Sequence, residues 1–164
     1  MSTHVLRSTM TVPVPLETVF SFFANAENLG QLTPDDLRFA IRTPLPIAME
    51  AGTLIDYRIA LHGVPMRWRT LISAWNPPFE FIDVQLKGPY AQWVHRHTFA
   101  AAGRSTTIRD EVHYRLPLGV FGDLAHPLVR RQLLHIFGYR QQAVVSLLAD
   151  SAGQPATLGP IEIS

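Results

Sequence analysis

The hydrophobic period of the chain changes once, near residue 120, and this change constrains the fold more than any other feature. Before it, several segments alternate polar and apolar residues with the period of two that is typical of strands. After it, one long helix is predicted over Asp123–Asp150, because its apolar residues share one arc at helical spacing. The residues of this arc are Val129, Leu133, Ile136, Phe137, Val144 and Leu147. A helix of about 28 residues is roughly 40 Å long, so a single sheet curved around it is the economical arrangement.

Turn residues divide the first part of the chain into one strand, two short helices and a series of further strands. Thr3–Val12 is predicted to be the first strand, and Leu16–Asn25 and Asn28–Thr33 are predicted to be short helices. The later strands are predicted at Leu37–Thr43, Thr53–His62, Pro65–Trp75, Glu80–Lys87, Gln92–Ala101 and Arg104–Leu116. The expected fold class is therefore α+β, with a curved antiparallel sheet of about six to seven strands wrapped around the C-terminal helix.

Length and composition indicate one globular domain. With 164 residues, 47% hydrophobic and 16% charged, the chain can bury a substantial core. We expect the domain to span residues 1–150, and we expect Ser151–Ser164, which is rich in Gly, Pro, Ala and Ser, to be a flexible tail.

Charge and motif content exclude several classes of function. A net charge of +1 without a dense run of basic residues does not favour nucleic-acid binding, and the absence of cysteine excludes thiol catalysis and disulfides. Neither a dinucleotide-binding fingerprint nor a phosphate-binding loop is present, so no cofactor is predicted. No apolar run is long enough to span a membrane, and the N-terminus does not look like a signal peptide, so a cytoplasmic protein is expected. The oligomeric state does not follow from the sequence.

Two histidines lie on the predicted inward face of one strand. In Gln92–Phe99 the alternation places His95 and His97 on the face that also carries Trp93 and Phe99. The apolar face of the next strand carries Asp110. A tight turn at Ala102-Gly103 would place His95 opposite Asp110 and Trp93 opposite Val112. Polar groups that converge in an apolar interior are typical of a small-molecule pocket.

Two more charged residues are candidates for this interior. Arg140 lies near the middle of the apolar arc of the helix, so we expect it to point inward and to pair with Asp110 or Asp83. It remains open which alternate residues of the predicted strand Glu80–Lys87 face inward. A three-residue connection to the next strand brings Asp83 opposite His95, and a two-residue connection brings Ile82 there. The same residues also suit a buried ion-pair network that only ties the helix to the sheet.

Several stretches of the sequence resemble the START-like helix-grip superfamily, also called SRPBCC, which includes polyketide cyclases and dehydratases. The resemblance covers about residues 3–150. The stretches are Val19-Phe20, Asn28-Leu29, Leu32-Thr33-Pro34, Asp56-Tyr57-Arg58, Gly63-Val64-Pro65, Trp68, Phe81-Ile82-Asp83-Val84-Gln85, Gly88-Pro89-Tyr90, Trp93-Val94-His95-Arg96-His97-Thr98-Phe99, Asp110-Glu111-Val112 and Ile136-Phe137-Gly138-Tyr139-Arg140. The resemblance implies a helix-grip fold with a ligand cavity between sheet and helix, and it favours the parity in which Asp83 faces inward.

The expected function is binding of a mostly apolar small molecule in that cavity. The predicted ligand-binding residues are Tyr57, Trp68, Asp83, Gln85, Trp93, His95, His97, Asp110, Tyr114, Phe121, Phe137 and Arg140. One alternative is a cyclase- or dehydratase-type enzyme that uses His95 or His97 as a general acid or base, with Asp110 as a further catalytic candidate. Another alternative is a module that handles lipids or partners without chemistry.

Two further interpretations of the sequence concern a metal site and a gate. His95 and His97 are expected to lie about 7 Å apart at Cα on one strand face, and Asp110 could be the third ligand of a metal site there. This spacing is a weak signal, so no metal ligands are assigned. Leu116–Gly122 is apolar and carries two glycines, so we expect a mobile gate over the cavity, with a fixed plug as the alternative.

Overall fold

One antiparallel sheet of eight strands, in the order β2-β3-β4-β5-β6-β7-β1-β8, frames the molecule. The computed structural model describes residues 2–150 and 153–164. The strands are β1 (Thr3–Val12), β2 (Ala40–Ile41), β3 (Leu54–Leu61), β4 (Val64–Asn76), β5 (Glu80–Lys87), β6 (Gln92–Ala102), β7 (Ser105–Arg115) and β8 (Thr157–Ile163). The helices are α1 (Leu16–Ala24) and α2 (Val120–Val144), accompanied by the 3-10 turns η1 (Ala26–Leu29) and η2 (Asp35–Leu37) and the π-helical turn η3 (Val145–Ala149).

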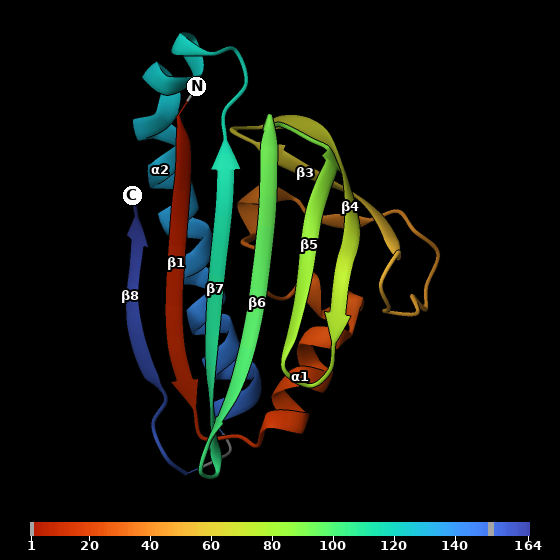
Figure 1. Ribbon diagram of the computed structural model, residues 1–164, viewed down its shortest axis with the longest axis vertical. Helices are drawn as coiled ribbons and strands as arrows, with labels where there is room; N and C mark the ends of the chain where they lie inside the picture. Colours follow the sequence, from red (N-terminus) through yellow and green to blue (C-terminus); the bar gives the residue numbers. More distant parts are fainter. Residues whose placement is uncertain (1, 151–152) are drawn as a thin grey trace.

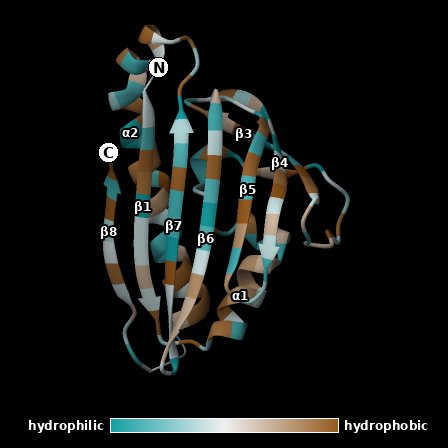
Figure 2. Ribbon diagram, in the orientation of Figure 1, coloured by the Kyte–Doolittle hydropathy of each residue, from teal (hydrophilic) through white to brown (hydrophobic). Residues whose placement is uncertain are grey.

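The long helix α2 covers one face of the sheet, as the sequence predicts. It runs behind β1 and β7, while α1 lies at the lower end of the strands β5 and β6 (Figure 1). Hydrophobic and hydrophilic residues alternate along strands such as β7, so one face packs on the helices and the other faces solvent (Figure 2). The expected α+β class, with a sheet curved around one C-terminal helix, is confirmed. The second short helix expected at Asn28–Thr33 is not formed: the 3-10 turn η1 ends at Leu29, and η2 begins only at Asp35.

The apolar arc of α2 is mostly buried as expected, with one exception. Leu133, Phe137 and Val144 are at most 3% exposed, but Leu147 is 43% exposed. The expectation for Leu147 is wrong because the helix widens into η3, whose longer turn changes which residues face the sheet. Ala149 is buried in its place. Among the described residues, no helix has both the length and the apolar character needed to cross a membrane.

The expected flexible tail contains a strand of the sheet. Thr157–Ile163 forms β8, which pairs antiparallel with β1. Ile161 and Ile163 pack against the core, and Gln141 Nε2 on α2 donates to the carbonyl of Gly159 at 3.2 Å. The expectation therefore fails for these residues, because small residues before the strand conceal a short alternating segment. Residues 151 and 152 of the expected tail lie outside the described residues.

The registers of β5, β6 and β7 decide which polar side chains meet. Asp83 pairs with His95, which is the register predicted for a three-residue connection, so Asp83 faces inward. Between β6 and β7 the predicted register is wrong by two residues: His97 pairs with Asp110, and His95 pairs with Val112. The turn lies at Gly103-Arg104, where Gly103 adopts φ +64°, and not at Ala102-Gly103. A shift of two residues keeps every side chain on its face, so the inward set is unchanged.

Candidate functional site

A cavity lies between the inner face of β3–β6, the helix α2 and the segment that runs from the end of α1 to Phe39. The space that the centre of a water molecule can reach inside it is about 180 Å³. Its wall is predominantly apolar and is formed by residues such as Phe23, Leu37, Ile55, Ile59, Trp93, Leu133 and Phe137. The residues predicted to bind ligand that do line it are Tyr57, Trp68, Asp83, Trp93, His95, His97, Phe137 and Arg140. The cavity thus gathers most of the predicted site at one place.

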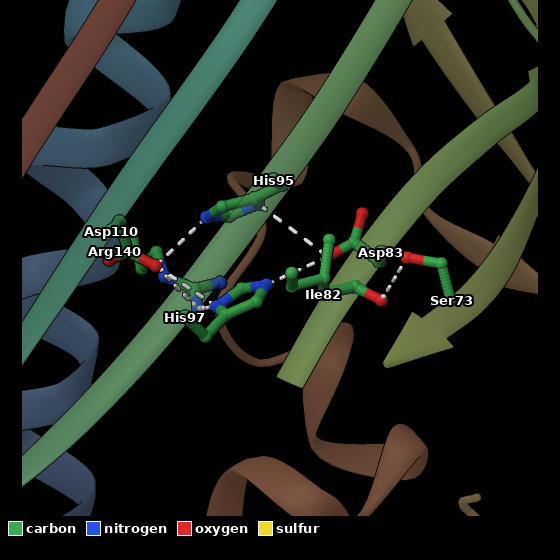
Figure 3. Close-up of polar contacts among 7 residues, drawn as sticks. All are labelled: Ser73, Ile82, Asp83, His95, His97, Asp110 and Arg140. Atoms are coloured by element: carbon green, nitrogen blue, oxygen red, sulfur yellow. Dashed lines mark hydrogen bonds and ion pairs between the residues drawn. The ribbon is translucent and has the colours of Figure 1, made fainter. Parts of the chain in front are cut away.

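Five charged or titratable side chains from four elements meet at the wall of this cavity. Asp83 comes from β5, His95 and His97 from β6, Asp110 from β7 and Arg140 from α2 (Figure 3). The centroids of the two imidazole rings are 3.7 Å apart. Asp83 lies on one side of these rings, and Asp110 and Arg140 lie on the other. We call these five residues the polar cluster.

His97 lies between the two carboxylates of the polar cluster. Its Nε2 is 2.7 Å from Asp83 Oδ2, and its Nδ1 is 3.0 Å from Asp110 Oδ1. Because a carboxylate accepts hydrogen bonds, each nitrogen donates when the ring is protonated. Burial lowers the pKa of His97, but the hydrogen bonds to Asp110 and Asp83 outweigh it and raise the pKa above its ordinary value. The two carboxylates therefore favour the protonated form of His97.

His95 differs from His97 although both rings are buried. Its Nε2 donates to Asp110 Oδ1 at 2.9 Å, while its Nδ1 is 3.7 Å from Asp83 Oδ2, too far for a hydrogen bond. Burial and the neighbouring charge of His97 lower the pKa of His95, despite its contacts with the two carboxylates. In the cluster each buried carboxylate has an imidazole as a hydrogen-bond partner, and Arg140 lies beside Asp110.

Arg140 points inward and meets a carboxylate, as predicted, and its partner is Asp110. Its NH2 group is 3.5 Å from Asp110 Oδ1 and 3.3 Å from His97 Nδ1, and its guanidinium lies 5.1 Å from the centre of the Phe23 ring. Burial raises the pKa of Asp110, but Arg140 and the two imidazoles outweigh it and hold this pKa well below its usual range. Asp110 is therefore ionised and ties the helix α2 to the sheet through Arg140.

Comparison with solved structures identifies the fold. A START superfamily protein from Mycobacterium smegmatis matches 88% of this chain and 99% of its own, with a TM-score of 0.66 and 17% identity. The protein TTHA0849 from Thermus thermophilus matches 87% and 98%, with a TM-score of 0.68 and 17% identity. Major latex-like protein 151 from Panax ginseng matches 89% and 97%, with a TM-score of 0.65 and 10% identity. The chain has the START-like helix-grip fold. No known family profile and no curated protein matches the sequence, and identities this low establish the fold alone.

In this helix-grip fold, four residues predicted to bind ligand do not line the cavity. Gln85 turns to the neighbouring loop, where its Nε2 donates to the carbonyl of Tyr90 at 2.8 Å. Tyr114 is fully buried beside the cavity, and its hydroxyl is 2.9 Å from His126 Nε2. Asp110 lies behind the two imidazoles, where it binds them without lining the cavity. Phe121 is 76% exposed.

The expected gate also does not border the cavity of the helix-grip fold. None of the residues in Leu116–Gly122 lines it. The helix α2 already begins at Val120, which turns Phe121 outward together with Leu118, Val120 and Leu124, each more than 70% exposed. Leu116 alone of the large side chains in this segment is buried. The prediction failed because an apolar loop covers a cavity only when its backbone path leads there, and this path leads away.

One wall of the cavity was not predicted from the sequence. Asn25–Phe39 supplies Ala26, Asn28, Leu29, Leu32, Leu37 and Phe39 to the lining. The signal that could have found it is the apolar content of this segment, whose residues Leu32 and Leu37 are buried. Asn28 Nδ2 donates to the carbonyl of Phe22 at 2.9 Å, which holds the segment against the end of α1.

Proposed function

We propose that the protein binds a mostly apolar small molecule in the cavity, with a polar group of that molecule placed at the polar cluster. The observation that carries this proposal is the distribution of polarity in the cavity wall. Aromatic and aliphatic side chains form most of the wall, while Asp83, His95, His97 and Arg140 lie next to one another in it. Binding sites for small molecules combine an apolar wall with a few polar groups that fix orientation.

Unused hydrogen-bonding groups indicate what the polar group of the ligand is. Asp83 has the most exposed side chain of the polar cluster, with 17% of it accessible. Its Oδ1 receives no hydrogen bond from the residues that the structure describes, so a ligand hydroxyl or amide N–H is a suitable partner. The indole Nε1 of Trp68, another lining residue, is buried without a partner in the described chain. A ligand with both a donor and an acceptor satisfies these two groups.

A substitution that fills the cavity tests the proposal. Ile136 lines the cavity on α2, so Ile136→Trp is expected to weaken binding of an environment-sensitive fluorescent dye or of a co-purified ligand at least tenfold. Wild-type affinity is expected in the micromolar range, roughly −8 kcal/mol. Leu128→Trp on the same helix is the control, since Leu128 is 55% exposed and does not line the cavity. Equal binding by both variants, measured by fluorescence titration and native mass spectrometry, contradicts the proposal.

General acid–base catalysis by His95 or His97 is the second candidate function. It is favoured by the position of both imidazoles in the cavity wall, each beside a carboxylate that orients it. A ligand extracted from the purified protein would separate the possibilities: a molecule that the protein converts supports catalysis, and a lipid returned unchanged supports a handling module. His97→Gln would abolish conversion of such a molecule if His97 moves the proton.

A further inference from the structure

The polar cluster also has the form of a metal site. We propose that Asp83, His95 and His97 bind one divalent transition-metal ion, such as zinc, with a coordination position open to the cavity. This proposal does not depend on the apolar ligand, since the three side chains are in place whatever the cavity holds. Imidazole and carboxylate groups are ligands that suit Zn²⁺ and its first-row neighbours.

The three ligand atoms face one another. Asp83 Oδ2, His95 Nδ1 and His97 Nε2 all lie within 4.8 Å of one another. Asp83 Oδ2 is 2.7 Å from His97 Nε2 and 3.7 Å from His95 Nδ1. Ligand atoms around a tetrahedral zinc ion lie roughly 3.3 Å apart, given bond lengths of about 2.0–2.2 Å. The two separations from Asp83 Oδ2 bracket this value, so small side-chain movements bring these atoms to the spacing of metal ligands.

His95 provides the observation that an ion-pair network leaves unexplained. His95 is 6% exposed, and its Nδ1 has no hydrogen-bond partner among the described residues, because Asp83 is too distant. Its Nε2 donates to Asp110, which fixes the tautomer and leaves a lone pair on Nδ1. A buried ion-pair network normally gives each of its nitrogens a hydrogen-bond partner, and Nδ1 of His95 has none among the described residues. The second imidazole, with its free nitrogen directed toward Asp83, is what a metal ion requires (Figure 3).

Asp110 lies behind the two histidine ligands, on the side away from Asp83. One of its oxygens, Oδ1, is 2.9 Å from His95 Nε2 and 3.0 Å from His97 Nδ1. Both imidazoles therefore turn their remaining nitrogens toward Asp83. Carboxylates that bind the far nitrogen of a ligating histidine orient the ring and increase its basicity. Arg140 NH2 lies 3.5 Å from the same oxygen and holds Asp110 in place. Asp110 is therefore a positioning residue that orients the two histidine ligands.

The position of the site leaves room for a further ligand of the metal. Asp83, His95 and His97 all line the cavity, whereas Asp110 does not. Three protein ligands and one open position are typical of zinc sites that bind water or a substrate, and structural zinc sites instead have four protein ligands. A polar group of a molecule in the cavity would thus reach the ion directly.

Metal titration of the intact protein tests the proposal. After removal of metals with a chelator, Zn²⁺ is titrated by calorimetry and Co²⁺ is titrated by visible absorption. We expect one ion per chain with micromolar or tighter affinity, and Co²⁺ absorption bands of a four- or five-coordinate site. Asp83→Asn and His97→Gln should each weaken binding at least 100-fold and abolish the bands. His113→Gln is the matched control, because His113 lies on β7 and its side chain pairs with the surface residue Glu111.

Further variants separate a metal site from a structural cluster. Asp110→Asn should weaken Zn²⁺ binding about 10- to 100-fold and shift the Co²⁺ bands without abolishing them, since it perturbs the orientation of the ligands and not their number. Circular dichroism identifies any variant that fails to fold, and Asp83→Asn, which keeps the shape of the side chain, then carries the test. The proposal is overturned if the wild type binds no stoichiometric ion, or if Asp83→Asn and His113→Gln bind it equally well.

Discussion

At the scale of single residues, the polar cluster stands out because it concentrates charge in a buried place. Asp110 and Arg140 are 6% and 9% exposed, and each would be costly to bury alone. Both of them contact the imidazole of His97, and Asp83 contacts it from the other side, so the fold depends on several specific side chains. Such dependence is typical of a site kept for function, because a well-packed apolar cluster of equal volume stabilises a core at least as well.

Asp110→Asn is expected to destabilise the protein by about 3–5 kcal/mol. The substitution removes the carboxylate that faces Arg140 NH2 at 3.5 Å and leaves that guanidinium without its partner. Chemical denaturation measures the free energy of unfolding. The double variant Asp110→Asn/Arg140→Met should recover part of the loss, since no unpaired charge then remains buried. A double variant whose loss equals the sum of the two single losses would contradict a direct interaction between the two side chains.

At the scale of elements, α2 and β8 protect the sheet that the earlier strands form, one of them at a face and the other at an edge. The helix buries one face from Gly122 to Val144, and β8 covers the edge of β1. β8 is itself an edge strand, but it carries Pro160, which lacks the backbone donor that a further strand would need. Figure 1 shows that β8 and α2 lie side by side, and Gln141 links them through its hydrogen bond to Gly159.

Leu133→Ala should lower the free energy of unfolding by about 2–5 kcal/mol, because Leu133 is 1% exposed in the contact between α2 and the sheet. Leu128→Ala, nearer the start of the same helix, is the control. Leu128 is 55% exposed, so a change within about 0.5 kcal/mol is expected. Urea denaturation of both variants checks the difference, and equal effects would show that α2 packs in another orientation.

A chain ending at Asp150 is expected to be less stable and to self-associate. Loss of β8 removes the antiparallel pairing of β1 from Leu6 to Thr11 and leaves β1 as an unprotected edge. Thermal denaturation and size-exclusion chromatography measure the two effects. Glu162→Ala is the control, since Glu162 is exposed and its backbone pairing survives the substitution. A truncated chain that remains monomeric with an unchanged melting temperature would show that β8 contributes nothing to the sheet.

At the scale of the whole molecule, the cavity couples elements that are distant in sequence. Its wall includes Phe23 on α1, Ile59 on β3, His95 on β6 and Phe137 on α2. A molecule that fills the cavity therefore contacts both layers of the fold at once. Unfolding of any of these elements destroys the binding site, so binding should stabilise the folded chain as a unit.

A ligand at 100 times its dissociation constant should raise the free energy of unfolding by about 2.7 kcal/mol. The expected result is a melting temperature that increases with ligand concentration, measured by differential scanning calorimetry. Leu128→Trp should retain this increase and Ile136→Trp should lose it, because only Ile136 lines the cavity. A ligand that binds but leaves the melting temperature unchanged would place its site outside the cavity.

The sequence alone determined most of the layout of the fold and the face on which most residues of the polar cluster lie. The alternation in β6 and the arc of α2 place His95, His97 and Arg140 inward, because side-chain direction follows from local backbone geometry. The inward direction of Asp83 needed the connection between β5 and β6, which local periodicity left open.

Only the tertiary structure decided which inward groups touch. The pairing of His97 with Asp110 depends on a turn displaced by one residue, and the path of Leu116–Gly122 away from the cavity depends on where α2 begins. β8 forms because β1 offers it an edge, and its own sequence is too short and too rich in small residues to predict a strand. These features arise from contacts between distant segments, whose free energies no local pattern contains.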